Sequence, residues 1–208
     1  MYVYWKRGFD IVGAALLLLV FSPVMAVVAF VIRIKLGREV LFCQLRPGLH
    51  EKPFRIYKFR TMANLYDAAG ELLPDDKRYI PFGGWIRRLS LDELPQLLNV
   101  LKGDMSLIGP RPLLMRYGPY YSEREKLRFT VRPGMTGLAQ VSGRNRLGWN
   151  ERLACDIAYV EGLGLRQDLA ILGRTVLKVL RQDGVVANPG EQDPPLDAHR
   201  MAGKEGSA

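Results

Sequence analysis

The chain has 208 residues, of which 48% are hydrophobic and 25% charged, so it is long enough for one domain with an appendage and too apolar to be disordered throughout. Its net charge of +9 favours anionic partners: nucleic acid, phosphorylated metabolites or acidic lipid headgroups. Cys43 and Cys155 lie in no C-x-x-C pair, and His50 and His199 have no partner at metal-ligand spacing, which argues against a disulfide scaffold and a zinc site. Any catalytic metal is therefore expected to be a hard, oxygen-liganded cation such as Mg²⁺.

An uncharged run from Ile11 to Ile32 predicts a helix in contact with a membrane. At roughly 1.5 Å per residue the run is about 33 Å long as a helix, enough to cross the hydrocarbon core of a bilayer. It is longer than the apolar core of a secretory signal, which has about 7 to 15 residues. An ordinary spanning helix is the alternative, and two features weigh against it.

The first feature is Ser22-Pro23 at the midpoint of the run, and the second is positive charge at both of its ends. Pro23 lacks a backbone N–H and clashes with the preceding turn, so we expect a kink, with the Ser22 hydroxyl available to a carbonyl freed there. The flanking cations are typical of the cytoplasmic side: Lys6, Arg7, Arg33, Lys35 and Arg38. These features favour a re-entrant helix-break-helix over residues 1–36. Asp10 is expected to pair with the basic residues before it or to be solvated.

The remaining chain predicts a small α+β domain, mostly helical, over residues 37–187. Turn signals and periodicity predict two strands and two helical segments, at residues 40–44, 54–62, 94–101 and 150–184. In the second strand, period 2 places Lys58 and Arg60 on one face. Residues 63–80 are expected to form a short helix and a loop, the helical segment at 150–184 to be amphipathic and interfacial, and residues 188–208 to be a disordered tail.

Asp92 and Glu93 are adjacent carboxylates immediately before the predicted helix at 94–101. A structural interpretation is available, because Asp is a good helix cap and Ser90 with Glu93 matches an S-x-x-E capping box. The surrounding sequence favours chemistry, since five cations flank the pair: Lys58, Arg60, Arg87, Arg88 and Arg111. These cations have the alternative of being solvated at the surface.

Arg111 lies between Pro110 and Pro112, which hold it in a stiff extended stretch. Arginine binds phosphate in a bidentate manner and reorganises little when its backbone is fixed, so this arrangement is typical of a phosphate-handling site. If the substrate is a pyrophosphate, the chemistry requires Mg²⁺ and Arg to neutralise phosphate oxygens, and an oxygen nucleophile. An Asp carboxylate can be that nucleophile by forming an acyl phosphate.

Six motifs carry a resemblance to a known family: Lys6-Arg7-x-x-Asp10, Ser22-Pro23, Gln44-x-Arg46-x-Gly48, KFRTM at 58–62, SLDELPQLLNVLKGDMSLIGPRP at 90–112 and RPGMTGLAQVSGR at 132–144. In these motifs, and over about residues 1–186, the chain resembles the bacterial sugar transferases called monotopic phosphoglycosyl transferases. The LDELPQ and IGPRP blocks are the most specific. The resemblance implies a re-entrant membrane helix broken at Ser22-Pro23 and a cytoplasmic catalytic domain at the membrane surface.

The resemblance also implies a reaction at the cytoplasmic face of the bacterial inner membrane. A phosphosugar would pass from a UDP-sugar to a polyprenyl phosphate, typically undecaprenyl phosphate, with release of UMP. Asp92 would be the nucleophile that forms a covalent phosphosugar intermediate, with Glu93 beside it and Mg²⁺ reaching Asp92 through the substrate pyrophosphate. The implied substrate-binding residues are Lys58, Arg60, Arg87, Arg88, Pro110, Arg111 and Pro112.

Two other functions are compatible with the composition. A catalytically silent membrane adaptor of the same fold is one, although an intact carboxylate pair with its arginines argues against it. A nucleic-acid binder is the other, but no helix-turn-helix, zinc-finger or RNP pattern is present, so we expect no nucleic acid as partner. The sequence indicates neither the sugar nor the oligomeric state.

Overall fold

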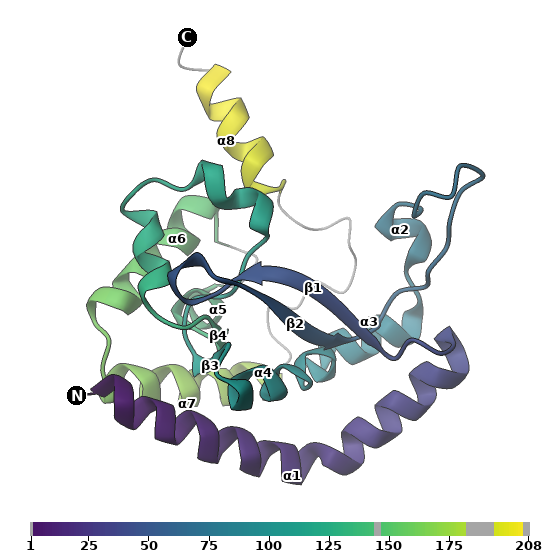
Figure 1. The fold of residues 1–208 in the computed structure, drawn as a ribbon, viewed down its shortest axis with the longest axis horizontal. Coiled ribbons are helices and arrows are strands. Elements are labelled where there is room, and N and C mark those ends of the chain that lie inside the picture. The colour runs from purple at the N-terminus through teal and green to yellow at the C-terminus, as the bar shows by residue number, and fades with distance from the viewer. Residues whose placement is uncertain (1, 144–146, 182–193, 206–208) are drawn as a thin grey trace.

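The computed structural model describes residues 2–143, 147–181 and 194–205. Within them the fold is mostly helical with short strands, as the sequence predicts (Figure 1). The helices are α1 (Tyr2–Leu36), α2 (Asp75–Arg78), α3 (Pro81–Arg88), α4 (Gln96–Lys102), α5 (Leu138–Ser142), α6 (Trp149–Glu161), α7 (Leu165–Arg181) and α8 (Leu196–Glu205). The strands are β1 (Leu41–Pro47), β2 (Pro53–Phe59), β3 (Ser106–Ile108) and β4 (Gly134–Thr136).

Strands β1 and β2 form an antiparallel hairpin, in which Phe42 is paired with Lys58 and Arg46 with Phe54. Directly paired residues share a face of the sheet, so alternate side chains of both strands point the same way. The inner face packs on α4, where Phe54 joins a buried cluster that includes Leu97. Both predicted strands are therefore present, with β1 extending three residues further and β2 ending three residues earlier than expected.

The parallel pair β3 and β4 was not expected from the sequence, because each strand has only three residues. Its tight approach depends on glycine, since a Cβ atom on Gly134 would lie 2.0 Å from the backbone nitrogen of Gly109. The Gly134 amide donates to the Pro110 carbonyl at 2.9 Å. This sheet therefore fixes the stretch that leads into Arg111.

Helix α1 bends near its middle but remains one continuous helix through Pro23, so the predicted break is a bend (Figure 1). Ser22 Oγ donates to the Leu19 carbonyl at 2.9 Å. Leu19 is four residues before Pro23, so its carbonyl is the one that the missing proline N–H leaves without a helical partner. The expected role of the Ser22 hydroxyl is confirmed.

Both halves of α1 pack against the same domain. Near its start, Arg7 donates to the carbonyls of Val100 and Leu101 in α4 at 2.7 and 3.0 Å. Near its end, Val28 and Ile32 are buried in a cluster with side chains of β2 and α3. Figure 1 shows the helix running along one edge of the molecule. Its most apolar window has a mean hydropathy of 2.8 and is only 11% buried, so α1 is long and apolar enough to enter a membrane.

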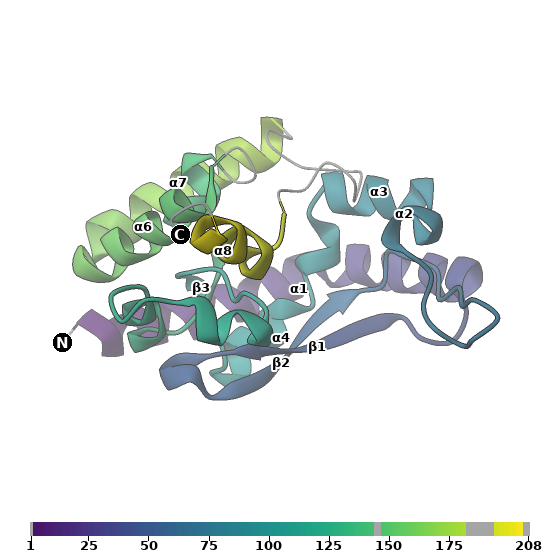
Figure 2. The ribbon, with the colours of Figure 1, turned by 90° about the horizontal axis from the view of Figure 1, so that it is seen from above.

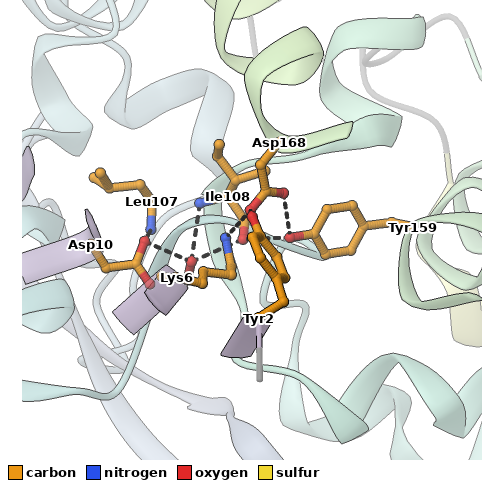
Figure 3. Close-up of polar contacts among 8 residues, drawn as sticks. Tyr2, Lys6, Asp10, Leu107, Ile108, Tyr159 and Asp168 are labelled. Carbon is orange, nitrogen blue, oxygen red and sulfur yellow. Dashed lines mark hydrogen bonds and ion pairs between the residues drawn. The ribbon is translucent and has the colours of Figure 1, made fainter. Parts of the chain in front are cut away.

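Figure 3 shows the contacts that clamp the start of α1. Asp168 of α7 accepts from Tyr2 Oη and Lys6 Nζ, each at 2.6 Å. Asp10 is 4% exposed and accepts from Ser106 Oγ and the Leu107 amide, each at 2.9 Å. Both expectations for Asp10 are therefore wrong, because the Ser106 hydroxyl and the Leu107 amide of β3 donate to it inside the domain.

Residues 194–205 correct the prediction of a disordered tail. They include α8, whose Leu196 is fully buried in an aromatic cluster with Tyr117 and Phe129, and Trp149 Nε1 donates to the Pro194 carbonyl at 2.8 Å. One apolar side chain in a polar segment gives no periodic signal, which is why the sequence did not indicate this docking. Residues 188–193 and 206–208 lie outside the described residues.

The helical segment predicted at 150–184 forms two helices, α6 and α7, and residues 182–184 lie outside the described part. Helix α7 exposes the apolar side chains Leu169, Leu172 and Leu180. Figure 2 shows α7 along the same side of the molecule as α6, above α1 in that view. The amphipathic character expected for this segment is confirmed in α7, which buries Ile171 and Asp168 on one side.

Candidate active site

Asp92 and Glu93 lie in a single 3₁₀ turn, Leu91–Glu93, between α3 and α4. Ser90, immediately before the turn, has φ 55° and ψ 20°, a left-handed conformation that is unfavourable for a residue other than glycine. Its side chain makes no capping hydrogen bond, and α4 begins only at Gln96. The structure therefore contradicts the capping-box interpretation and places the start of the α-helix four residues later than Asp92.

Glu93 is held by two cations. Its Oε1 accepts from Lys58 Nζ at 2.7 Å and from Arg111 Nη2 at 2.6 Å, and Arg111 Nη1 lies 3.4 Å from Oε2. The Glu93 side chain is 20% exposed, so these contacts are largely shielded from water. Although burial alone would raise it, Arg111 and Lys58 hold the pKa of Glu93 well below its usual range.

Asp92 has no hydrogen-bond or ion-pair partner among the residues that the structure describes. Burial, followed by the charge of Glu93, raises the pKa of Asp92 from 3.8 to about 6, while the charges of Lys58, Arg87 and Arg111 oppose this rise. The two adjacent carboxylates thus have pKa values shifted in opposite directions. Two cations hold Glu93 and lower its pKa, whereas Asp92 has no direct partner among the described residues and its pKa is raised.

The backbone of Arg111 is fixed on both sides, as its two flanking prolines predict. Pro110 accepts from β4, and the Arg111 carbonyl accepts from Arg128 Nη2 at 2.6 Å. Arg128 is buried and forms an ion pair with Asp156 at 2.9 Å. Pro112 is buried, while the Arg111 side chain remains 43% exposed. Arg111 is therefore preorganised and accessible, two properties that phosphate recognition needs.

Arg87 and Arg88 are adjacent at the end of α3 but have different environments. Arg87 Nε donates to Thr61 Oγ1 at 2.9 Å, and the charge of Arg87 acts on Asp92. Arg88 is exposed and makes no contact with the carboxylate pair. The structure thus brings Arg87 to the site with Lys58 and Arg111 and leaves Arg88 outside it.

Arg60 has a structural role that the sequence did not predict. It is 8% exposed, donates through Nη2 to the Leu36 carbonyl at the end of α1, and lies 3.3 Å from Glu39. Strand β2 ends at Phe59, so the alternation that places Lys58 toward Glu93 does not continue to Arg60. The prediction that Arg60 binds substrate has no support in this geometry.

Gln44 and Arg46 of β1 were not predicted to belong to the site. They lie on the hairpin face shared with Lys58, and the charges of Glu93 and Arg111 both act on Arg46. The register of the β1–β2 hairpin is the signal that would have placed them at the site. Gln44 lies opposite Ile56 and Arg46 lies opposite Phe54, so both side chains share a face of the hairpin with Lys58.

The donor set fits a magnesium ion only if the substrate supplies most of the ligands. No group of three or more His, Cys, Asp or Glu side chains able to hold a metal is present in the described part of the chain. Both oxygens of Glu93 are engaged by cations, so Asp92 is the carboxylate that remains available. Mg²⁺ is commonly bound by one or two carboxylates together with substrate phosphates, which matches this site.

An apolar cavity of about 470 Å³ lies next to the carboxylate turn. Its walls come from the bend of α1, from α3 and from the residue before Asp92: Pro23, Val24, Val27, Val28, Val31, Phe82, Trp85 and Leu91. The cavity therefore extends from the apolar surface of α1 to Leu91, the residue before Asp92.

Comparisons with known proteins show which sequences this chain is similar to. Residues 1–182 match the family described as bacterial sugar transferase. An uncharacterized sugar transferase, EpsL, of Bacillus subtilis is 48% identical over 198 residues, which cover 95% of this chain and 96% of that protein. The UDP-glucose:undecaprenyl-phosphate glucose-1-phosphate transferase of Caulobacter vibrioides is 43% identical, over 86% of this chain and 70% of that protein. The undecaprenyl-phosphate galactose phosphotransferase of Salmonella typhimurium is 40% identical, and the match covers 87% of this chain but 41% of that longer protein.

Proposed function

Since the chain belongs to the bacterial sugar transferase family and is a phosphoglycosyl transferase, we propose that it transfers a sugar phosphate from a UDP-sugar to undecaprenyl phosphate or a similar polyprenyl phosphate, releasing UMP. The observation that carries this proposal is the contrast within one turn. The Asp92 side chain has no direct partner among the described residues, whereas Lys58 and Arg111 hold Glu93. The names of two relatives specify undecaprenyl phosphate, which supports the acceptor.

In the first half-reaction, an Asp92 carboxylate oxygen attacks the phosphorus atom that carries the sugar. The bond from that phosphorus to the bridging oxygen breaks, UMP leaves with the bridging oxygen, and an acyl phosphate joins Asp92 to the phosphosugar. Arg111 and Lys58 face the reacting group with fixed positive charge, which stabilises the charge that develops on the phosphate oxygens. Mg²⁺, held by Asp92 and the pyrophosphate, would supply further neutralisation.

In the second half-reaction, a phosphate oxygen of the polyprenyl acceptor attacks the same phosphorus and displaces the Asp92 carboxylate. The product is a polyprenyl diphosphate sugar, and the enzyme returns to its starting state. The apolar cavity beside Leu91 supports this step, because it offers an isoprenoid chain a path from α1 to the carboxylate turn.

Glu93 orients the cations in this mechanism and does not move protons. A carboxylate with two cations at 2.7 and 2.6 Å and a pKa far below neutrality is a poor general base. Its negative charge also balances Lys58 and Arg111 when no substrate is bound. Glu93 therefore keeps both cations in place and opposes ionisation of Asp92 through its own charge.

The membrane arrangement is part of the same proposal. Helix α1 enters the inner membrane from the cytoplasm, turns back at the Pro23 bend and leaves on the same side. The contacts of Lys6 with Asp168 and of Arg60 with Leu36 support this, because they tie the two ends of α1 to one domain. A helix that crosses a bilayer places its ends about 30 Å apart on opposite sides, which is incompatible with both contacts.

A release assay tests the reaction. The purified chain in nanodiscs is mixed with Mg²⁺, undecaprenyl phosphate and each member of a panel of UDP-sugars, and UMP is measured. We expect continuous UMP release with at least one donor, only when the acceptor is present, and none from Asp92→Asn. An adaptor without catalysis would release no UMP from any donor, and equal release by Asp92→Asn would contradict the mechanism.

A further inference from the structure

Arg46 is a cation of the site with an incomplete set of partners. Its Nη2 donates to Gln44 Oε1 at 2.6 Å, while its Nε is buried and has no hydrogen-bond partner. No carboxylate forms an ion pair with Arg46 among the residues that the structure describes. A buried guanidinium normally has a carboxylate or a full set of acceptors, since desolvation of its charge is costly.

The environment of Arg46 disfavours its positive charge. Burial and then the charge of Arg111 lower the pKa of Arg46 to about 10, and the charge of Glu93 only partly compensates. Glu93 is already shared by Arg111 and Lys58. Arg46 and Arg111 therefore lie close enough for their charges to repel, and the nearby carboxylate of Glu93 already binds Arg111 and Lys58. A bound anion would stabilise this arrangement.

The position of Arg46 indicates which anion it meets. Strand β1 begins five residues after α1, and Arg46 lies near the far end of the strand. Arg46 does not line the apolar cavity at the α1 bend. The lipid acceptor approaches from the membrane side, along that cavity. A water-soluble donor has no need of that cavity and can bind at Arg111, whose charge acts on Arg46.

Resting on the proposed function, we propose that Arg46, oriented by Gln44, binds the nucleotide phosphate of the UDP-sugar, which is the phosphate that leaves as UMP. Arg111 then contacts the phosphate that is transferred, and the two arginines hold the two phosphates of the donor on either side of the bond that breaks. Gln44 has a positioning role, because its Oε1 accepts from Arg46 Nη2 and so fixes the orientation of the guanidinium.

Equilibrium binding of UDP in the presence of Mg²⁺, measured by calorimetry on the full chain in nanodiscs, tests this assignment without knowledge of the sugar. We expect Arg46→Met to weaken UDP binding by about 10- to 100-fold, the range given by loss of a charged hydrogen bond. Arg46→Lys keeps the charge but loses the planar fork and should be intermediate. Arg55→Met is the matched control, since Arg55 is exposed on the opposite face of the same hairpin and should keep wild-type affinity.

Kinetics separate donor from acceptor. In the UMP-release assay, Arg46→Met should raise KM for the UDP-sugar and leave KM for the polyprenyl phosphate unchanged, whereas a general loss of structure would affect both. Wild-type affinity for UDP in both Arg46 variants, or a rise in KM for the acceptor alone, would overturn the inference and leave the proposed function standing. Failure of the wild-type chain to bind UDP at all would overturn both.

Discussion

Asp92 and Glu93 are consecutive residues of one turn, yet the structure gives Glu93 two cations and gives Asp92 no direct partner among the described residues. The difference follows from the direction in which the Glu93 side chain points. The Glu93 side chain points toward Lys58 of β2 and the extended stretch that carries Arg111, whereas Asp92 is influenced by the same cations only through longer-range charge. A pair of carboxylates that looks symmetric in sequence is therefore divided into one that two cations hold and one without a direct partner among the described residues.

Asp92→Asn separates the catalytic interpretation from a structural one. A structural role predicts little change in either folding or activity, because the Asp92 side chain makes no hydrogen bond or ion pair with the described residues that an amide would break. As the nucleophile, Asp92 is irreplaceable by an amide, and we expect turnover to fall by several orders of magnitude while thermal stability stays the same or rises slightly. Mass spectrometry of wild-type protein with donor but no acceptor should find one phosphosugar on Asp92. Wild-type turnover in the variant would contradict the mechanism.

The raised pKa of Asp92 predicts the pH dependence of the reaction. The attacking carboxylate must be ionised, so kcat/KM should rise with pH through a midpoint of about 6, well above the ordinary value of 3.8. Glu93→Gln removes the neighbouring negative charge and releases Lys58 and Arg111 toward Asp92. Both effects lower the pKa of Asp92, so the midpoint should move to more acidic pH.

The same Glu93→Gln variant should turn over more slowly at pH 8, by about 10- to 100-fold, because the two cations lose the group that orients them. Pre-steady-state release of UMP at several pH values measures the ionisation that matters for the first half-reaction. A midpoint that moves to higher pH in this variant would show that the charge of Glu93 does not act on Asp92 in the way the structure indicates.

The long elements of the fold were predictable and the short ones were not. Helix α1, the β1–β2 hairpin and the pair α6 and α7 have apolar patterns that extend over many residues, and each was expected. Strands β3 and β4 have three residues each, too few for periodicity, and they form only because Gly109 and Gly134 approach closely. Helix α8 docks through one buried leucine, Leu196. Such contacts depend on distant residues and leave no local pattern.

The site shows a similar division. Asp92, Glu93 and Arg111 were expected because their motifs are dense and local. The contacts of Arg60 with Leu36 and Glu39 were not expected, since they depend on where β2 ends and on where the α1 carbonyls lie in space. Arg46 received no role, because its position beside Arg111 follows from pairing between strands and not from spacing along the chain.

Arg60 and Lys58, two residues apart, are expected to respond differently to substitution. Arg60→Met removes a buried charged donor from the Leu36 carbonyl and should lower the free energy of unfolding by about 1 to 3 kcal/mol, with little effect on KM for the donor. Lys58→Met removes a cation from Glu93 and should reduce kcat/KM with a smaller effect on stability. Thermal unfolding and UMP release, measured on both variants, compare them directly. A larger loss of turnover in Arg60→Met than in Lys58→Met would restore Arg60 to the site.

Magnesium should bind with the substrate and only weakly without it. Asp92 is the one carboxylate of the pair that is free to coordinate, and the described residues offer no cluster of three ligands. We therefore expect EDTA to abolish turnover, added Mg²⁺ to restore it, and calorimetry to detect tight Mg²⁺ binding only when UDP is present. Full turnover in chelator would refute a role for the metal.

Bending of α1 should depend on Pro23. Pro23→Ala restores the amide that the Leu19 carbonyl lacks, so the helix should straighten and the Ser22 hydroxyl should lose its partner. A straighter helix favours crossing the bilayer, in competition with the contacts that hold both ends of α1. We expect the variant to place a fraction of its N-termini outside the cytoplasm, and to lose turnover in that fraction because the wall of the apolar cavity is displaced.

The re-entrant arrangement predicts that both ends of α1 are in the cytoplasm. Val3 and Arg38 are exposed and flank the apolar segment, so Val3→Cys and Arg38→Cys report on its two ends when Cys43 and Cys155 are first replaced by serine. In intact cells a membrane-impermeant maleimide should label neither position, and it should label both once the membrane is opened. A spanning helix would expose one end to the reagent in intact cells, and labelling of Val3→Cys alone from outside would rule out the re-entrant arrangement. Such a result would also require the contact between Lys6 and Asp168 to be broken in the membrane, since Asp168 belongs to the catalytic domain on the other side.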